Sequence, residues 1–168
     1  MRFKVFGTPV ELFSYMEAGA AFDRYTVFKC KKFSFGFHVF HEAERLYPPH
    51  DHYNDFLSVA VWGGYKEELW DEPEKTLDGS YFRTRDVFSA HIMRHTAAHR
   101  LIELHKPRFG KVTTFFVAGS RAKDLPHYFT RDGMLTFWEF WDVDDFQALL
   151  KVNPKELKAR RPLEEYVV

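Results

Sequence analysis

Two histidines stand one residue apart in the polar segment His50-Asp51-His52-Tyr53-Asn54-Asp55. On an extended segment residues i and i+2 point the same way, so His50 and His52 can present two imidazoles to one divalent metal ion. A third ligand must come from elsewhere in the chain, and His99, which opens a predicted strand, is the candidate. The alternative interpretation is that these histidines are ordinary polar residues at the starts of strands.

A carboxylate can complete such a site, and the sequence offers Asp55 and Glu67. Asp55 with two histidines would give the facial arrangement of non-haem iron oxygenases. Strict alternation puts Asp55 on the opposite side from His52, so this ligand requires a bulge. Glu67 requires that its strand lie beside the segment with His50, as a short turn at Gly63-Gly64 would bring about.

Further residues could act on a substrate. Tyr65 and Glu67 follow the two glycines and can face the inside of a barrel as proton donor and base, although a tyrosine in a strand is more often a packing residue. Arg94 and Arg121 can bind a carboxylate or phosphate of a small molecule, because a guanidinium binds such groups through two parallel hydrogen bonds. Alternatively, these arginines pair with acidic residues on the surface.

The elements that must position these residues are mostly short strands. From Phe33 to Val39 aromatic and aliphatic residues alternate with Ser, Gly and His, which is the period of a strand with one face on a core. Further strands are predicted at 3–6, 56–62, 65–69, 81–83, 87–89, 99–104, 112–118 and 134–141. Many short strands separated by turns such as Asp78-Gly79 and Asp132-Gly133 indicate a β-sandwich or barrel.

Two helical regions are expected outside this barrel. Thr8, Pro9 and Glu11 match a capping box with proline in the first turn, which predicts a helix over 9–18. The mixed charges near the end of the sequence predict a helical tail with a solvated face. We therefore expect a single domain over 1–168, with an N-terminal helix region at 1–24, a barrel at 25–142 and the tail at 143–168.

Composition excludes several classes of protein. Lys plus Arg and Asp plus Glu each number 24 in 168 residues, and this balance argues against a protein that binds duplex DNA through phosphate contacts. Cys30 is the only cysteine, so thiolate zinc fingers and intrachain disulfides are excluded. No apolar run reaches membrane-spanning length, so we expect a cytoplasmic protein. The aromatic run 137–141 is expected in the core or in a homodimer surface.

The same residues resemble a known family. The pair His50-x-His52 followed by Gly63-Gly64, and then Asp86-Val87 with His99 a dozen residues later, is similar to the two motifs of the cupin superfamily. The segment 50–56 also resembles the hallmark His-Asp-His-Pro-Trp-Asp-Phe of small, mostly uncharacterised cupin-like proteins of bacteria and their phages. The resemblance implies an all-β, double-stranded β-helix (jelly-roll) barrel and a divalent metal. On this pattern Asp55 is favoured over Glu67 as the fourth ligand.

Three functions are then expected as alternatives. The first is a metal-dependent enzyme of the Fe(II) oxygenase type acting on a small molecule, with Zn, Ni or Mn as other candidate metals. The second is a non-catalytic barrel that binds a small ligand and keeps a structural metal. The third is a metal-independent, sugar-type isomerase or epimerase that uses histidine and tyrosine as acid and base.

Overall fold

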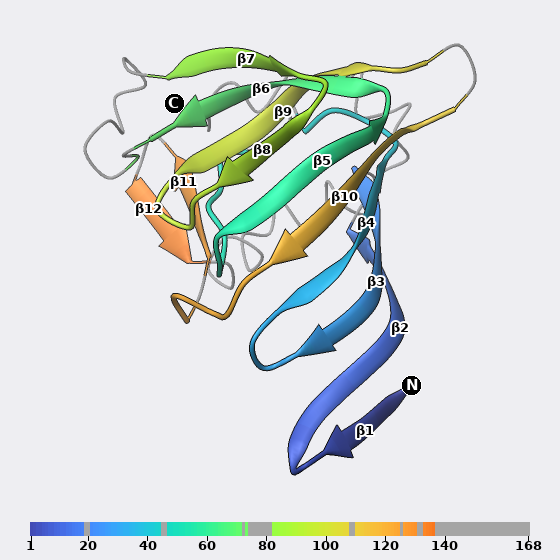
Figure 1. The fold of residues 1–168 in the computed structure, drawn as a ribbon. Coiled ribbons are helices and arrows are strands. Elements are labelled where there is room, and N and C mark those ends of the chain that lie inside the picture. The colour runs from blue at the N-terminus through green and yellow to red at the C-terminus, as the bar shows by residue number, and fades with distance from the viewer. Residues whose placement is uncertain are drawn as a thin grey trace.

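The computed structural model describes residues 1–18, 21–44, 47–71, 73, 82–107, 110–124, 126–130 and 133–136, and this part of the chain is built almost entirely of β-strands (Figure 1). The strands are β1 (Arg2–Val5), β2 (Thr8–Ala18), β3 (Phe22–Cys30), β4 (Ser34–Phe40), β5 (Phe56–Trp62), β6 (Gly64–Trp70), β7 (Arg83–Val87), β8 (Ala90–Met93), β9 (Ala98–His105), β10 (Val112–Ala118), β11 (His127–Thr130) and β12 (Gly133–Thr136). No helix in these ranges is long and apolar enough to cross a bilayer.

The strands form two antiparallel sheets that enclose a common core. The larger sheet has the order β1-β2-β3-β4-β10-β5-β8, and the smaller has the order β7-β6-β9. Both sheets contribute to one cluster of buried side chains: Phe40 and Val112 come from the large sheet, and Tyr65, Val87 and Leu101 come from the small one. The strands β11 and β12 pair with each other as a separate hairpin. This arrangement confirms the expected barrel of two facing sheets.

Alternation along the strands decides which side chains enter the barrel. In β10 the residues Val112, Thr114, Phe116 and Ala118 are buried, while those between them are only partly so. The predicted strand boundaries at 56–62, 65–69, 99–104 and 112–118 agree closely with β5, β6, β9 and β10. The strands predicted at 81–83 and 87–89 are displaced, because β7 and β8 lie at Arg83–Val87 and Ala90–Met93.

The predicted helix over 9–18 is wrong, because this segment is strand β2. Along its length β2 pairs with β3, and its first residues also pair with β1. Tyr15 lies opposite Tyr25 with ring centroids 5.2 Å apart, and its hydroxyl donates to Asp23 at 2.9 Å. A helix cap contributes only about 1 kcal/mol, whereas pairing with β3 along most of β2, and with β1 at its start, satisfies the backbone over many residues. The helical tail predicted at 143–168 lies outside the described residues.

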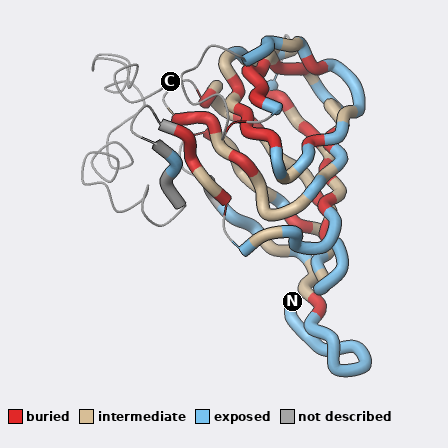
Figure 2. The backbone as a smooth tube through the Cα atoms, turned by 90° about the vertical axis from the view of Figure 1, so that its left-hand side faces the viewer, coloured by how far each residue is buried: buried red, intermediate tan, exposed pale blue. Residues whose placement is uncertain are grey.

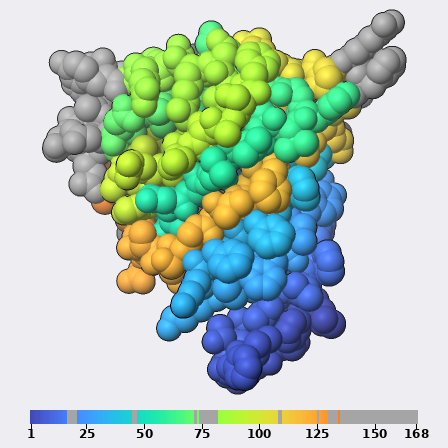
Figure 3. Space-filling view, viewed as in Figure 1, coloured from blue at the N-terminus to red at the C-terminus, as the bar shows by residue number. Residues whose placement is uncertain are grey.

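The outer strands extend away from the barrel. Figures 1 and 2 show β1 and the adjoining part of β2 projecting below the two-sheet body, with mostly exposed residues. Phe6 and Phe13, both with positive φ, are among the exposed aromatic residues there. In the space-filling view the large sheet forms one continuous outer face, crossed diagonally by β8, β5, β10 and β4 in that order (Figure 3).

The Gly63-Gly64 turn passes the chain from one sheet to the other. Gly63 has a φ of 73°, a left-handed conformation that glycine adopts without steric cost. Strand β5 before the turn pairs with β10 and β8, and strand β6 after it pairs with β7 and β9. The expected hairpin that would bring Glu67 beside the segment with His50 is therefore not formed. That segment lies instead against β9.

Candidate metal centre

The segment before β5 is fixed to β9 and β11 by its backbone. The amide of His50 donates to the carbonyl of His99 at 3.0 Å, and the amide of His99 donates to the carbonyl of His50 at 2.9 Å. Asp51 is buried; its carboxylate accepts from the amide of His127 at 2.6 Å and pairs with Lys123. These contacts hold His50 directly beside His99, although 49 positions separate them in the sequence.

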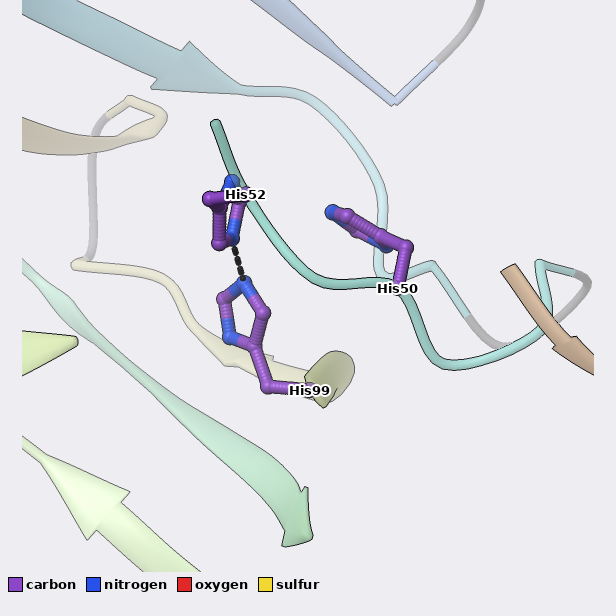
Figure 4. Close-up of side chains that lie close together, drawn as sticks. All are labelled: His50, His52 and His99. Atoms are coloured by element: carbon purple, nitrogen blue, oxygen red, sulfur yellow. Dashed lines mark hydrogen bonds between the residues drawn. The ribbon is translucent and has the colours of Figure 1, made fainter. Parts of the chain in front are cut away.

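The structure brings the three predicted histidines together. Nε2 of His52 lies 2.8 Å from Nε2 of His99, and one of these ring nitrogens donates to the other (Figure 4). The ring centroid of His50 lies 5.1 Å from the ring centroid of His52 and 5.3 Å from that of His99. One nitrogen from each ring lies within 4.8 Å of the other two. These three histidines form a cluster that can hold a metal ion.

The protonation of these rings suits metal binding. Burial lowers the pKa of His50, and burial lowers the pKa of His52 well below its usual value, with the neighbouring histidines adding to the effect. Neutral imidazole is the form that ligates metals such as iron, zinc and nickel. Two nitrogens that each bind an ion at about 2.1 Å can be at most about 4.2 Å apart, and the His52–His99 distance satisfies this limit. Two of the three imidazoles are therefore already close enough to share one divalent transition metal ion, and the ligand nitrogen of His50 lies within 4.8 Å of both.

Glu67 supports the cluster through a hydrogen bond with His99, on the side of the ring away from His52. It is completely buried, and its carboxylate accepts from Nδ1 of His99 at 2.7 Å and from Nε of Arg85 at 2.5 Å. Burial alone would raise the pKa of Glu67, but its interactions with His99 and Arg85 outweigh this and hold the pKa at about 2. The ionised carboxylate fixes the proton of His99 on Nδ1 and leaves Nε2 free to face His52.

Asp55 does not join the cluster. Its Oδ1 atom accepts from the amide of His95 at 2.7 Å and lies 2.7 Å from Nδ1 of the same residue, and its side chain is half exposed. The hydrogen bonds from His95 lower the pKa of Asp55. Among the described residues the metal-capable group contains the three histidines without a carboxylate.

Comparisons with known proteins identify the fold. No protein-family model matches the sequence, and no curated protein is detectably similar to it. Oxalate decarboxylase from Bacillus subtilis aligns over 94% of this chain and 38% of its own, with a TM-score of 0.50 and 10% identity. An RmlC-like cupin from Shewanella frigidimarina aligns over 67% of this chain and 87% of its own (TM-score 0.45, 10% identity). KdgF from Halomonas sp. aligns over 67% of this chain and 96% of its own (TM-score 0.45, 17% identity).

The chain has a cupin fold. The barrel of two facing antiparallel sheets, expected from the sequence, is confirmed by the strand order and by the likeness to oxalate decarboxylase. At these identities the fold is what the proteins share.

Within this cupin barrel, Tyr65 lies on the face of the small sheet that packs against the core. Its side chain is buried, and its hydroxyl lies 3.3 Å from Nε2 of His91 on β8. Burial, followed by the nearby charge of Glu67, raises the pKa of Tyr65, and burial lowers the pKa of His91 to about 4. Tyr65 is therefore a phenol that keeps its proton, and His91 is a neutral imidazole beside it.

The two arginines proposed from the sequence lie nearer the surface. Arg121 donates to the carbonyls of Lys123 and Asp124 in its own loop, and its guanidinium lies 4.5 Å from the centre of the Tyr53 ring. Arg94 is exposed and lines a pocket of about 380 Å³ together with Arg83 and Arg85.

Sequence reasoning missed Arg85 and His91, which contact Glu67 and Tyr65. Arg85 lies opposite Glu67 in the pairing of β7 with β6, and the cross-sheet contact of His91 with Tyr65 depends on how the two sheets face each other. No local motif marks either residue, so only knowledge of strand register could have found them.

Proposed function

We propose that this protein is a metal-dependent enzyme of the Fe(II) oxygenase type that acts on a small molecule inside the barrel. The proposal is carried by one observation: His50, His52 and His99 lie close together, and Glu67 accepts a hydrogen bond from His99. Imidazole ligands suit iron, and three protein ligands leave coordination positions open for a substrate. Zn, Ni and Mn are the alternative ions.

The bound ion would supply Lewis-acid or oxygen chemistry, and the residues of the chain prepare the site for it. Glu67 holds His99 in one tautomer, and burial keeps the other two imidazoles neutral. Tyr65 keeps its proton and can donate it or a hydrogen bond to a substrate in the barrel. Arg94 and Arg121, whose side chains are exposed, would then bind an acidic group of the substrate from outside the barrel.

Metal analysis of protein purified without chelator or nickel resin tests the first part of this proposal. We expect about one divalent ion per chain. The test of open coordination is the addition of nitric oxide to anaerobic, Fe(II)-loaded protein, which should give the electron paramagnetic resonance signal of an iron nitrosyl. Metal that binds but gives no nitrosyl signal would contradict the oxygenase and favour the alternative of a structural metal in a ligand-binding barrel.

One observation favours a second candidate function. Tyr65 and His91 form a buried pair of a proton donor and a neutral base, which is the equipment of a metal-independent isomerase or epimerase. Protein without metal that still exchanges a substrate proton with deuterated water, and loses this exchange in Tyr65→Phe, would favour this candidate over the oxygenase.

A further inference from the structure

Several buried polar side-chain atoms of this protein have no hydrogen-bond partner. Among the described residues, the buried side-chain nitrogen and oxygen atoms that lack a hydrogen bond are Nε of Arg24, Nδ1 of His50, Nη2 of Arg85, Nδ1 of His91 and Oγ1 of Thr114. Folded proteins leave few such atoms unsatisfied, and each one costs free energy unless a ligand or water pairs with it. Each of these atoms is available to a polar ligand.

Arg24 is the most unusual of these residues. It lies on β3 directly opposite His38 of β4, and its guanidinium carbon lies 4.5 Å from the centre of the Phe116 ring. The ring of His38 stacks on the same phenylalanine at 4.5 Å, with the planes 12° apart. No carboxylate in the described part of the chain pairs with Arg24. Burial lowers the pKa of this guanidinium, as expected for a charge removed from water without a counter-ion.

This guanidinium lies on the wall that faces the histidine cluster. Phe116, on which Arg24 rests, is almost fully buried inside the barrel. Burial, followed by the nearby charge of Arg24, lowers the pKa of His38 to about 3. Arg24 and His38 belong to the large sheet, and His99 belongs to β9 of the small sheet that faces it. The next strand of the same wall, β10, contributes Thr114, which lies opposite His38 and is 1% exposed with its hydroxyl unpaired.

The facing sheet contributes a second guanidinium. Nε of Arg85 donates to Glu67, which accepts from His99, so Glu67 connects the arginine to the histidine cluster. Its charge is balanced by Glu67, but its buried Nη2 atom has no partner. The charge of Arg24 is left without balance on the opposite wall. A divalent ion at the histidines would add further positive charge to the same interior.

We infer that the interior of the barrel binds a small hydroxy acid, with Arg24 as the receptor for its carboxylate. A guanidinium binds a carboxylate through two parallel, charge-assisted hydrogen bonds. The hydroxyl of Thr114, which lies opposite His38 on the next strand, is the group available to the hydroxyl of the ligand. This inference names the substrate class of the proposed enzyme and therefore rests on that function. It transfers the role of binding an acid from Arg94 and Arg121 to residues inside the barrel.

Binding of lactate, compared with its neutral isostere lactamide, tests the inference. Titrations followed by nuclear magnetic resonance on metal-free and on zinc-loaded protein should show lactate binding and much weaker lactamide binding. Arg24→Gln should raise the dissociation constant for lactate at least about tenfold, since a charge-assisted bidentate pair is lost. Arg24→Lys keeps the charge without the planar fork and should fall between the two. Zinc content should be unchanged in both variants.

The matched control is Arg100→Gln. Arg100 is also partly buried, but it pairs with Glu68, and both residues alternate with the inward-facing Glu67 and His99. This variant should bind lactate within about twofold of the wild type. Equal lactate affinity in Arg24→Gln and wild-type protein would overturn the inference. Inorganic phosphate that binds as well as lactate would overturn the assignment to a carboxylic acid.

The stability of the ligand-free variant gives an independent readout. A buried charge without a partner opposes folding, so Arg24→Gln should melt at the same temperature as the wild type or higher. A large drop in melting temperature would show that Arg24 is structural and would overturn its role as a receptor. If the protein binds lactate through Arg24 but binds no metal, the inference holds and the metal-dependent function fails. If it binds metal but no lactate, the reverse is true.

Discussion

Oε2 of Glu67 lies 2.7 Å from Nδ1 of His99, on the side of the imidazole that faces away from His52. A carboxylate in this position orients a ligating histidine and increases its basicity. We therefore predict that Glu67→Gln weakens metal binding about 10- to 100-fold without abolishing it. Competition with a fluorescent zinc chelator measures this change.

The neighbouring residue provides the control for this prediction. Glu68 is also buried, but its carboxylate pairs with Arg100, and both residues alternate along their strands with Glu67 and His99. Glu68→Gln should lower stability while leaving the zinc affinity close to that of the wild type. Equal losses of affinity in the two variants would show that the effect of Glu67 is a general loss of packing.

Removal of any one of the three histidines should remove most of the bound metal. His50→Ala, His52→Ala and His99→Ala each leave two imidazoles, which seldom hold a divalent ion tightly. Mass spectrometry of metals in the purified variants measures the stoichiometry. His41→Ala is the control, because His41 pairs with Asp23 at 2.9 Å and lies outside the cluster. Unchanged metal in all three cluster variants would refute the site.

The three histidines could be found from the sequence because their signal is local or belongs to a strand start. Alternation put His50 and His52 on one side, and the start of a predicted strand pointed to His99, which the family resemblance then supported. The fourth ligand could not be decided in this way. Asp55 lies near His52 in sequence, but its carboxylate accepts from the backbone of His95, a contact 40 positions away in the chain.

The rest of the interior depends on register between distant strands. Arg24 stands in a run of mixed polar and aromatic residues, and nothing in that run shows that it enters the barrel. Only its pairing opposite His38, and the pairing of β4 with β10, place it over Phe116. The N-terminal helix was predicted wrongly for the same reason, since local capping signals carry no information about the partner strands of β2.

Acid should destabilise the metal-free protein partly through His38. The folded-state pKa of about 3, caused first by burial, lies below the ordinary value of 6.5. Between these values the unfolded chain binds a proton that the folded chain does not, so the free energy of unfolding falls as the pH falls. The slope for one such group reaches about 1.4 kcal/mol per pH unit. Urea denaturation between about pH 7 and pH 5 should therefore show a shallower loss for His38→Phe than for the wild type. Parallel pH profiles would contradict this account.

At Gly36 the strands β3 and β4 approach each other too closely for a side chain. A Cβ atom at this position would lie 2.0 Å from the carbonyl oxygen of Tyr25 and 2.9 Å from Cα of Thr26. These are backbone atoms, so the strands themselves must shift, and Gly36→Ala should destabilise the protein by about 1–3 kcal/mol. Gly119→Ala is the matched control, since its Cβ would meet the carbonyl oxygen of Asp55 at an ordinary 3.7 Å. Because Gly36 pairs with Phe116, which supports Arg24, the shift should also weaken lactate binding in Gly36→Ala and leave it unchanged in Gly119→Ala. Similar unfolding midpoints for the two variants in urea would show that the strands can separate there at little cost.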